Sequence, residues 1–525
     1  MRVGGQADPG NRAGVTGAGR SRDNLRTERA GSSRALDIAA ESDEPVPPMH
    51  PDPSDLPATP PLPAEGGPWR SVAAIVLAGA AVRLVLAAAV PVTVDEAYYV
   101  DWARHLQPGY LDHPPLVAWL VAAPLRLLGP SALAIRLPAV ALQAATTLLA
   151  ASLAGALAGR RAAITAAVVL QATPVFSLGA TLVTPDAPLA LAWAGTLWAV
   201  ERALRRGGRW FLAAGLFLGV GALSKLTAGL LGIAVLAALL ATRDGRRALA
   251  SPWPWLGAAL ALAVASPMLA WNAARGWPSV TFQATHGARG GGFSPIALAR
   301  SVGAQAGYVS PLVLALAAAA AWRALRAPRT AAVAALAFSA LPVVAFFTLA
   351  AAFTPGALPH WPAPGWLSAT VLLAAAGTRL FRPALWVGFA SSALVVGAVL
   401  LPLPVAGPLD ELRGWREGAA AARAAAGGAR LAANHWIVLG QIGWHDGASP
   451  AYLGERRSGP TLYDPAPRAA GAPLLLVTVP GLDPGREALE ARLGTLVPAG
   501  EVTAADRGRV VRRYRLFWVD APPAR

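Results

Sequence analysis

Two adjacent carboxylates, Asp95 and Glu96, follow directly on the apolar run at residues 71–90. Neighbouring residues on a helix point in different directions, so only one of the two can act on a given target. If residues 95–106 are helical, Asp95 shares a face with the rings of Tyr98, Tyr99 and Trp102, and Glu96 lies on another face. A carboxylate placed there can accept a proton as a general base or cap the start of a helix, and the residues leave both interpretations open.

The segment "GYLDHPPL" at residues 109–116 is a second candidate for chemistry. Its two prolines restrict the backbone and are expected to hold Asp112 and His113 in fixed positions, with Tyr110 just before them. A rigid segment of this kind can position side chains for a site. The alternative is an ordinary turn that leads into a helix.

Asp186 and Lys225 are the third candidate pair. Asp186 stands between two prolines in "TPDAPL" at the predicted end of an apolar segment, where an ionisable residue is costly and marks a site by default. Lys225 is the single lysine among 45 basic residues, and its compact charge suits a phosphate. The alternatives are a helix cap for Asp186 and a snorkelling side chain for Lys225.

Two further residues complete the set of candidate substrate contacts. Arg136 follows the first connection, and His360 lies in "LPHWPAPGW", whose tryptophans are predicted to be interfacial anchors. The chain contains neither an HExxH motif nor a GxSxG motif with a plausible triad, and its seven histidines are scattered. The residues therefore predict no metal site, although they do not exclude a divalent cation.

The composition places these residues in a membrane protein. The chain has 525 residues, of which 55% are hydrophobic and 14% charged, and its mean hydropathy is +0.45. The net charge of +16 does not indicate a nucleic-acid partner, because most arginines fall in short clusters between apolar segments. There are no cysteines, which excludes disulfides and thiolate metal sites.

About eleven apolar segments are long enough to be predicted as membrane spans. They lie at roughly 71–91, 132–158, 162–180, 186–204, 209–224, 226–242, 254–272, 295–322, 330–351, 361–377 and 384–402. Arginine clusters mark every second connection as cytoplasmic, provided that the short segment 116–128 is an interfacial helix that does not cross. The first connection (92–131), Asp186, Lys225 and the loop 352–361 then all lie on the extracytoplasmic side.

The two ends of the chain differ from this central part. Residues 1–70 lack apolar periodicity and the pattern of a signal peptide, so we expect a disordered cytoplasmic tail. Residues 403–525 are expected to form a small extracytoplasmic α/β domain. Within it, 409–428 and 485–494 are predicted as helices, and 436–444, 473–479 and 509–519 as strands.

The ordered motifs "DEAYYVDWARHL", "GYLDHPPLVAWL", "TPDAPL", "SKLTAGLL" and "HWPAPGWL" resemble membrane glycosyltransferases of the GT-C fold. The resemblance covers residues 71–402. It is closest to the family 39 and dolichyl-phosphate-mannose-protein mannosyltransferase-like group, which includes the lipid A aminoarabinose transferases. It implies a multi-span, all-α membrane fold with interfacial helices in the first outer loop.

The resemblance also implies transfer of a sugar from a polyprenyl-phosphate donor, usually with inversion. It makes Asp95 the base or acceptor-positioning residue and Asp186 the second acidic position. Tyr110, Asp112, His113 and Lys225 resemble the region that meets the donor, and we add Glu96, Tyr98, Arg136 and His360 as substrate contacts. One departure concerns His113, because relatives that transfer aminoarabinose have a lysine at that position.

We therefore expect an inverting glycosyltransferase in the cell membrane that acts on a lipid, glycan or protein acceptor outside the cytoplasm. A polyprenyl phosphate is already a good leaving group, so one base and one cationic clamp suffice. The alternatives are a transporter or flippase of a lipid-linked sugar, which predicts charges buried along several spans, and a scaffold that binds a partner.

Overall fold

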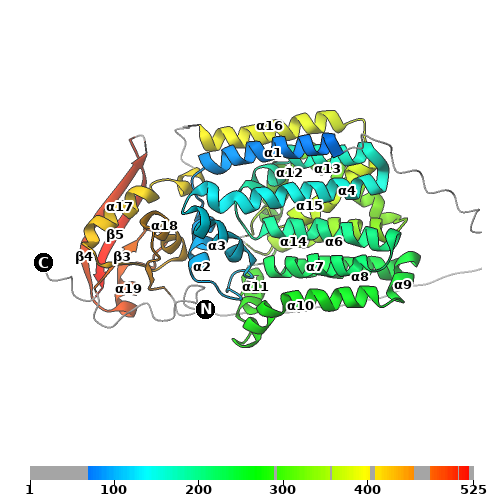
Figure 1. Ribbon diagram of the computed structural model, residues 1–525. Coiled ribbons are helices and arrows are strands. Elements are labelled where there is room, and N and C mark those ends of the chain that lie inside the picture. The colour runs from blue at the N-terminus through cyan, green and yellow to red at the C-terminus, as the bar shows by residue number, and fades with distance from the viewer. Residues whose placement is uncertain are drawn as a thin grey trace, which may run out of the picture. The chain divides into compact units, whose positions relative to one another are not determined.

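The computed structural model describes residues 69–288, 292–354, 357–401, 408–454, 473–506 and 508–519. The predicted tail lies outside the described residues, except for its last two, which begin helix α1 (Trp69–Ala89). Figure 1 shows long helices side by side, with α2 (Val94–Arg104) and α3 (Leu116–Leu128) at one end of the helical bundle and α9 (Arg243–Leu249) at the other.

The remaining elements of the helical part overlap the predicted apolar segments, except for the helix at residues 278–288. They are α4 (Ala132–Ala172), α5 (Pro174–Ser177), the 3-10 helix η2 (Gly179–Thr181), α6 (Asp186–Arg206), α7 (Trp210–Ser224), α8 (Ala228–Ala241), α10 (Trp253–Ala273), α11 (Pro278–Ala288), α12 (Pro295–Val309), α13 (Pro311–Arg326), α14 (Ala331–Ala351), α15 (Ala363–Ala376) and α16 (Phe381–Leu400).

The predicted number of eleven spans is not confirmed. In the described part of the chain, α1, α4, α10, α14 and α16 are long and apolar enough to cross a membrane, which gives five spans. The number rises to seven if the pairs α8–α9 and α12–α13, bent by 108° and 101°, each count as one. α4 contains two helices, separated by the non-helical residues Ala158 and Gly159 where the sequence predicts a connection, and the span count takes them as one. Gln171 Nε2 donates to Thr147 Oγ1 at 3.2 Å, so the second helix runs back along the first. α7, α8 and α15 have only 14 or 15 residues. The chain is nonetheless a multi-pass membrane protein.

The first connection folds as two short helices, as the sequence predicts. Thr93 caps α2 through a capping box, in which its hydroxyl accepts from the Glu96 amide and the Glu96 side chain accepts from the Thr93 amide. The 13-residue α3 begins after Pro115 and is too short to cross the hydrocarbon.

The C-terminal region, residues 408–519, contains a five-stranded sheet in the order β2-β1-β3-β5-β4. Its elements are η3 (Pro408–Leu412), α17 (Trp415–Ala426), β1 (Arg430–Ala433), α18 (Trp436–Asp446), β2 (Ala451–Tyr452), β3 (Leu474–Thr478), α19 (Arg486–Leu493), β4 (Leu496–Asp506) and β5 (Arg509–Val519). β1 pairs in parallel with β2 and β3, whereas β5 pairs antiparallel to β3 and β4.

One element of this region was predicted wrongly. Residues 436–444 form helix α18 and not a strand. The ring of His435 caps the helix by accepting from the Ile437 amide, and the buried residues Val438, Leu439 and Ile442 recur at helical spacing. The predicted strands at β3 and β5 and the predicted helices at α17 and α19 are confirmed, with small differences at their ends.

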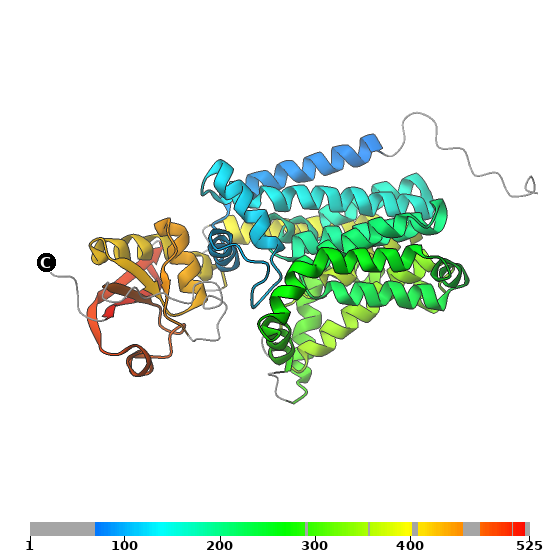
Figure 2. The same cartoon turned by 60° about the horizontal axis from the view of Figure 1, so that its bottom comes forward.

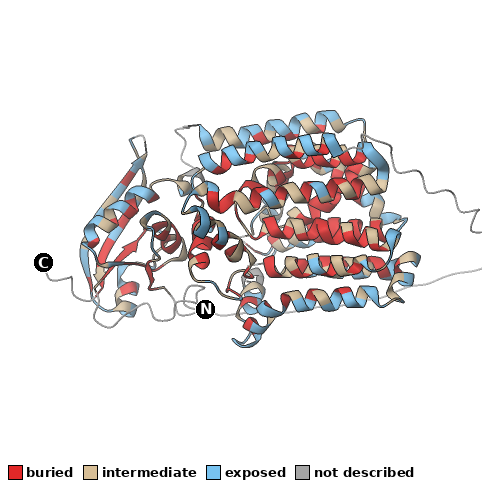
Figure 3. Cartoon of the chain, viewed as in Figure 1, coloured by how far each residue is buried: buried red, intermediate tan, exposed pale blue. Residues whose placement is uncertain are grey.

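The buried residues form one large cluster among the central helices and a second one around α2. In Figure 3, α1 and α16 carry many exposed residues, as expected of apolar helices that face lipid. The second cluster joins residues of α2 and α3 to residues of α17, α18 and the sheet. Figures 1 and 2 show α18 beside α2, with β5 farther away, and the second cluster is shared by α2, α17 and α18, so the C-terminal region has no separate core on that side.

Candidate active site

Helix α2 turns its two first carboxylates in different directions. Asp95 is exposed and lines a cavity at the end of the helical bundle, whereas Glu96 is fully buried. This confirms that the two neighbours cannot serve the same target. Of the predicted pair, Asp95 alone can meet a ligand.

Glu96 and Arg136 form a buried ion pair and do not line the cavity. The guanidinium donates Nε to Glu96 Oε1 at 2.7 Å and Nη2 to Oε2 at 2.6 Å. It also donates to the carbonyls of Ala87, Val90 and Pro91 at the end of α1. Glu96 further accepts from the Val183 amide at 3.0 Å. These two residues, expected as substrate contacts, instead fasten α1, α2, α4 and the segment before α6 to one another.

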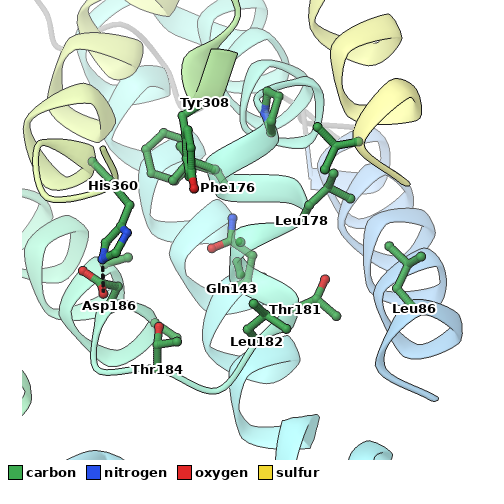
Figure 4. Close-up of a pocket in the computed structure, with 18 of the residues that line it drawn as sticks. Leu86, Gln143, Phe176, Leu178, Thr181, Leu182, Thr184, Asp186, Tyr308 and His360 are labelled. Carbon is green, nitrogen blue, oxygen red and sulfur yellow. Dashed lines mark ion pairs between the residues drawn. The ribbon is translucent and has the colours of Figure 1, made fainter. Parts of the chain in front are cut away.

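A cavity of about 700 Å³ lies where these elements meet. Its walls are mostly apolar and come from α1, α4, α5, α6, α12, α15 and α16. Figure 4 shows the labelled polar groups Gln143, Thr181, Thr184, Asp186, Tyr308 and His360 around it. Asp95 and Asp186 both line this cavity, although α2 and α6 lie far apart in the sequence. A cavity of this size and polarity suits a small polar group carried on an apolar chain.

Asp186 is the centre of a small charged cluster on one wall of the cavity. It is the first residue of α6, and Lys225, directly after α7, donates Nζ to its Oδ1 at 2.8 Å. Its other oxygen faces His360 Nε2 at 3.8 Å, the ion pair drawn in Figure 4. His113 lies within electrostatic range of the same carboxylate. The structure thus brings together four of the predicted residues around one point.

The surroundings of Asp95 favour its protonated form. Desolvation raises the pKa of Asp95 to about 6, and the carboxylates of Glu411, Glu96 and Asp186 act in the same direction, against the opposing charge of Lys225. A carboxylate with this pKa is still ionised at neutral pH and is a stronger base than an ordinary aspartate. Desolvation also lowers the pKa of His360, although the nearby Asp186 opposes that effect.

The predicted residues of the first connection hold its shape. The Tyr98 hydroxyl donates to Asp112 Oδ2 at 3.0 Å, and desolvation raises the pKa of Asp112 to about 6. Tyr110 is buried, stacks on Trp102 with ring centroids 4.1 Å apart, and donates its hydroxyl to backbone carbonyls at the end of α2. None of Tyr98, Tyr110, Asp112 and His113 is among the residues that line the described cavity.

The structure adds three residues that sequence reasoning missed. Gln143 lines the cavity from α4, and its Nε2 atom is buried without a hydrogen-bond partner among the described residues. Tyr308 lines it from the end of α12, just before the bend at Ser310. Glu411 acts on Asp95 from the C-terminal region. A polar residue within an apolar segment was the available signal for Gln143, whereas Tyr308 and Glu411 depend on tertiary contacts.

The described residues bring together no group of three or more His, Asp and Glu side chains suited to a metal ion.

Comparisons with known proteins agree with this architecture. Residues 112–271 match the family model described as dolichyl-phosphate-mannose-protein mannosyltransferase. A comparison with curated proteins finds no match. Among solved structures, ArnT from Cupriavidus metallidurans in the apo state is similar, with TM-score 0.63, 18% identity, and coverage of 86% of this chain and 98% of that chain.

The structure of the same protein bound to undecaprenyl phosphate gives TM-score 0.61 at 18% identity, with 86% of this chain and 98% of that chain covered. This chain therefore has the GT-C fold of membrane glycosyltransferases and contains a mannosyltransferase-like family segment, which confirms the resemblance predicted from its motifs.

Proposed function

We propose that this protein transfers a hexosyl or pentosyl group from a polyprenyl-phosphate donor to an acceptor on the extracytoplasmic side of the membrane, with inversion at the sugar. The acceptor is a lipid, a glycan or a protein. The observation that carries the proposal is that Asp95 and Asp186, on separate elements, line one largely apolar cavity. The matching family segment and the fold shared with ArnT, which was solved with undecaprenyl phosphate, support it.

In the proposed reaction Asp95 is the general base. Its carboxylate takes the proton of the acceptor hydroxyl while the acceptor oxygen forms a bond to the anomeric carbon. The bond from that carbon to the phosphate oxygen breaks, and its electron pair leaves with the phosphate. A single displacement of this kind inverts the configuration at the anomeric carbon. The raised pKa of Asp95 favours the proton transfer.

The leaving phosphate needs a cation, and Lys225 contacts Asp186, which lines the cavity. An ammonium has three N–H donors, of which one is used in the 2.8 Å contact with Asp186 Oδ1. In the proposed complex the other two donors meet phosphate oxygens. In this arrangement Asp186 holds the lysine in place, and His360 lies on the other side of the same carboxylate. The apolar walls provide a surface for the isoprenoid chain.

The test is transfer in proteoliposomes that contain the purified protein, a panel of radiolabelled polyprenyl-phosphate sugars, and extracted envelope lipids, glycans or peptides as acceptors. We expect a labelled product with the wild type and a loss of about 10²–10⁴-fold in turnover with Asp95→Asn, the usual contribution of a general base. The matched control is Glu487→Gln, an exposed carboxylate in the first turn of α19, which should transfer normally.

Full transfer by Asp95→Asn would remove Asp95 as the base. Movement of the labelled donor between leaflets without any covalent product would instead favour a transporter, an alternative for which the comparisons give no support. Residues 408–454 pack against α2, so their accessibility to a protease added outside the cell tests the assigned side of the membrane.

A further inference from the structure

Helix α18 of the C-terminal region lies directly on α2. At about 100° per residue, Ala97, Asp101 and Arg104 form a stripe on α2 opposite to Asp95. Each of these residues, or the backbone beside it, meets α18 or the segment that follows it. One face of α2 therefore carries Asp95 toward the cavity, and the opposite face packs against the C-terminal region.

The contact between the two helices is a close approach of backbones at Gly440. A Cβ atom placed at Gly440 would lie 2.8 Å from the Tyr98 amide nitrogen and 3.0 Å from the Ala97 carbonyl carbon. Cβ atoms essentially never lie 2.8 Å from a backbone nitrogen, so a larger residue at this position must displace α2 and α18 relative to each other. Beside it, the Trp436 and Tyr98 rings pack with centroids 5.1 Å apart.

Three hydrogen bonds tie the same surfaces together along the length of α2. Gln441 Nε2 donates to the Val92 carbonyl at 3.2 Å, just before the helix begins. Ser449 Oγ donates to Asp101 Oδ1 at 2.5 Å, and Arg104 Nη1 donates to the Gly443 carbonyl at 2.9 Å near its end. The contact thus fixes both ends of α2. Val92, at the nearer end, is three residues from Asp95.

We propose that the C-terminal region is a positioning element of the catalytic site, in which α18 holds α2 through the Gly440 contact and so fixes Asp95 over the cavity. This inference rests on the proposed function. It assigns to Gly440 and Gln441 an effect on the reaction through Asp95, without contact to substrate. The Glu96–Arg136 pair fixes the beginning of α2 from the bundle side, and α18 fixes it from the other.

The test compares Gly440→Val with Gly229→Val. Gly229 is an exposed helical glycine on α8 where an added Cβ meets nothing within 4 Å, so it controls for valine in a helix. With the panel donor that the wild type uses, we expect Gly440→Val to lower kcat about a hundredfold, the effect of displacing a catalytic group by about 1 Å. KM for the donor should change little, because the cavity itself is untouched, and the acid limb of the pH–rate profile should move. Unchanged kcat and pH profile in folded Gly440→Val would overturn the proposal.

Hydrogen exchange provides a readout that does not depend on activity. Amides of residues 92–104 should exchange faster in Gly440→Val than in the wild type and Gly229→Val. Faster exchange with normal kcat would show that the contact does not position the base. If the wild type transfers no sugar with any donor and acceptor combination, the proposed function is wrong. The exchange pattern would in that case still show that α18 stabilises α2.

A cysteine pair keeps the proposal testable if Gly440→Val does not fold. The natural chain has no cysteine, so Asp101→Cys with Ser449→Cys introduces a single pair where the side-chain oxygens lie 2.5 Å apart. In a background that also carries Gln441→Leu, oxidation should restore the kcat lost through that change, and reduction should reverse the rescue. An oxidised, folded protein that loses activity would show that the C-terminal region has to leave α2 during turnover, which contradicts the proposal.

Discussion

Asp95 and Glu96 are adjacent in the chain, but Glu96 is buried against Arg136 at 2.6 Å while Asp95 is exposed at the cavity. One peptide bond thus separates a residue that holds the fold from one that can do chemistry. The capping box at Thr93 sets the rotation of α2 and hence which carboxylate points which way. The two positions should therefore respond to substitution in opposite ways.

Replacement of Glu96 should unfold the protein more easily. Glu96→Gln leaves the Arg136 guanidinium buried without its counter-ion, which costs roughly 3–5 kcal/mol. Thermal unfolding in detergent measures the effect. Arg136→Gln is a second single change, and the double variant should lose less than the sum of both. Additive losses would contradict a coupled pair.

Replacement of Asp95 should not weaken the fold. The pKa of Asp95 is raised from 3.8 to about 6, so the folded protein binds this proton more tightly than the unfolded chain does. The wild type therefore loses stability relative to Asp95→Asn as the pH rises from 3.8 to about 6, and the difference stays constant above that. Unfolding midpoints at several pH values check this. A less stable Asp95→Asn at pH 8 would argue against the raised pKa.

Removal of the charge at Glu411 should make the enzyme active at lower pH. Glu411, Glu96 and Asp186 all raise the pKa of Asp95, and Lys225 opposes them. The base works when it is deprotonated, so transfer should decline as the pH falls through about 6 in the wild type. Glu411→Gln should shift this limb downward, whereas Glu487→Gln on α19 should leave it in place. An upward shift would contradict the electrostatic argument.

Narrowing the cavity should weaken binding of the lipid donor. Gly307 and Gly303 are both exposed on α12, and an added Cβ would meet nothing within 4 Å at either position. Of these two residues, Gly307 lines the cavity and Gly303 does not. Gly307→Leu should reduce affinity for undecaprenyl phosphate about tenfold or more, the effect of roughly 1–3 kcal/mol of overpacking. Gly303→Leu should bind as the wild type does. Equal affinities in both variants would place the lipid elsewhere.

Replacement of Lys225, the single lysine, should weaken binding of the donor's phosphate group. Lys225→Met is expected to weaken binding of undecaprenyl phosphate about 10- to 100-fold, because a hydrogen bond to a charged group contributes roughly 1.5–3 kcal/mol. Polyprenol without phosphate should compete equally well in both proteins. Arg300→Met, which removes an exposed cation from α12, is the matched control for the change in net charge.

The helices and the cluster around Asp186 could be predicted because their signals are local. Apolar length predicts helices wherever they occur, and Lys225 and Asp186 were found through rarity and position. Alternating connections predict that both residues lie at the same end of the bundle, and the structure shows their side chains in contact at 2.8 Å. The span count was less accessible, because short helices and the bend at Ser310 depend on tertiary packing.

The rest of the site depends on contacts that no local pattern contains. The aromatic and β-branched residues of 436–444 favour a strand, but burial against α2 and the cap at His435 stabilise the helix α18. The sequence gives no sign that Arg136 is paired, and only the structure shows that its guanidinium donates to three backbone carbonyls and to the Glu96 carboxylate. Gln143 and Tyr308 reach the cavity through the packing of α4 and α12.

The shared core around α2 also bears on biosynthesis. Arg104 meets Gly443, which the ribosome adds 339 residues later. A nascent chain can insert α1 to α16 and enclose the cavity while the aromatic rings of α2 still lack their cover. If α18 positions Asp95 as proposed, catalytic competence should arise only after the C-terminal region has folded onto α2, and a prematurely stopped product should enclose the cavity without holding Asp95 in place.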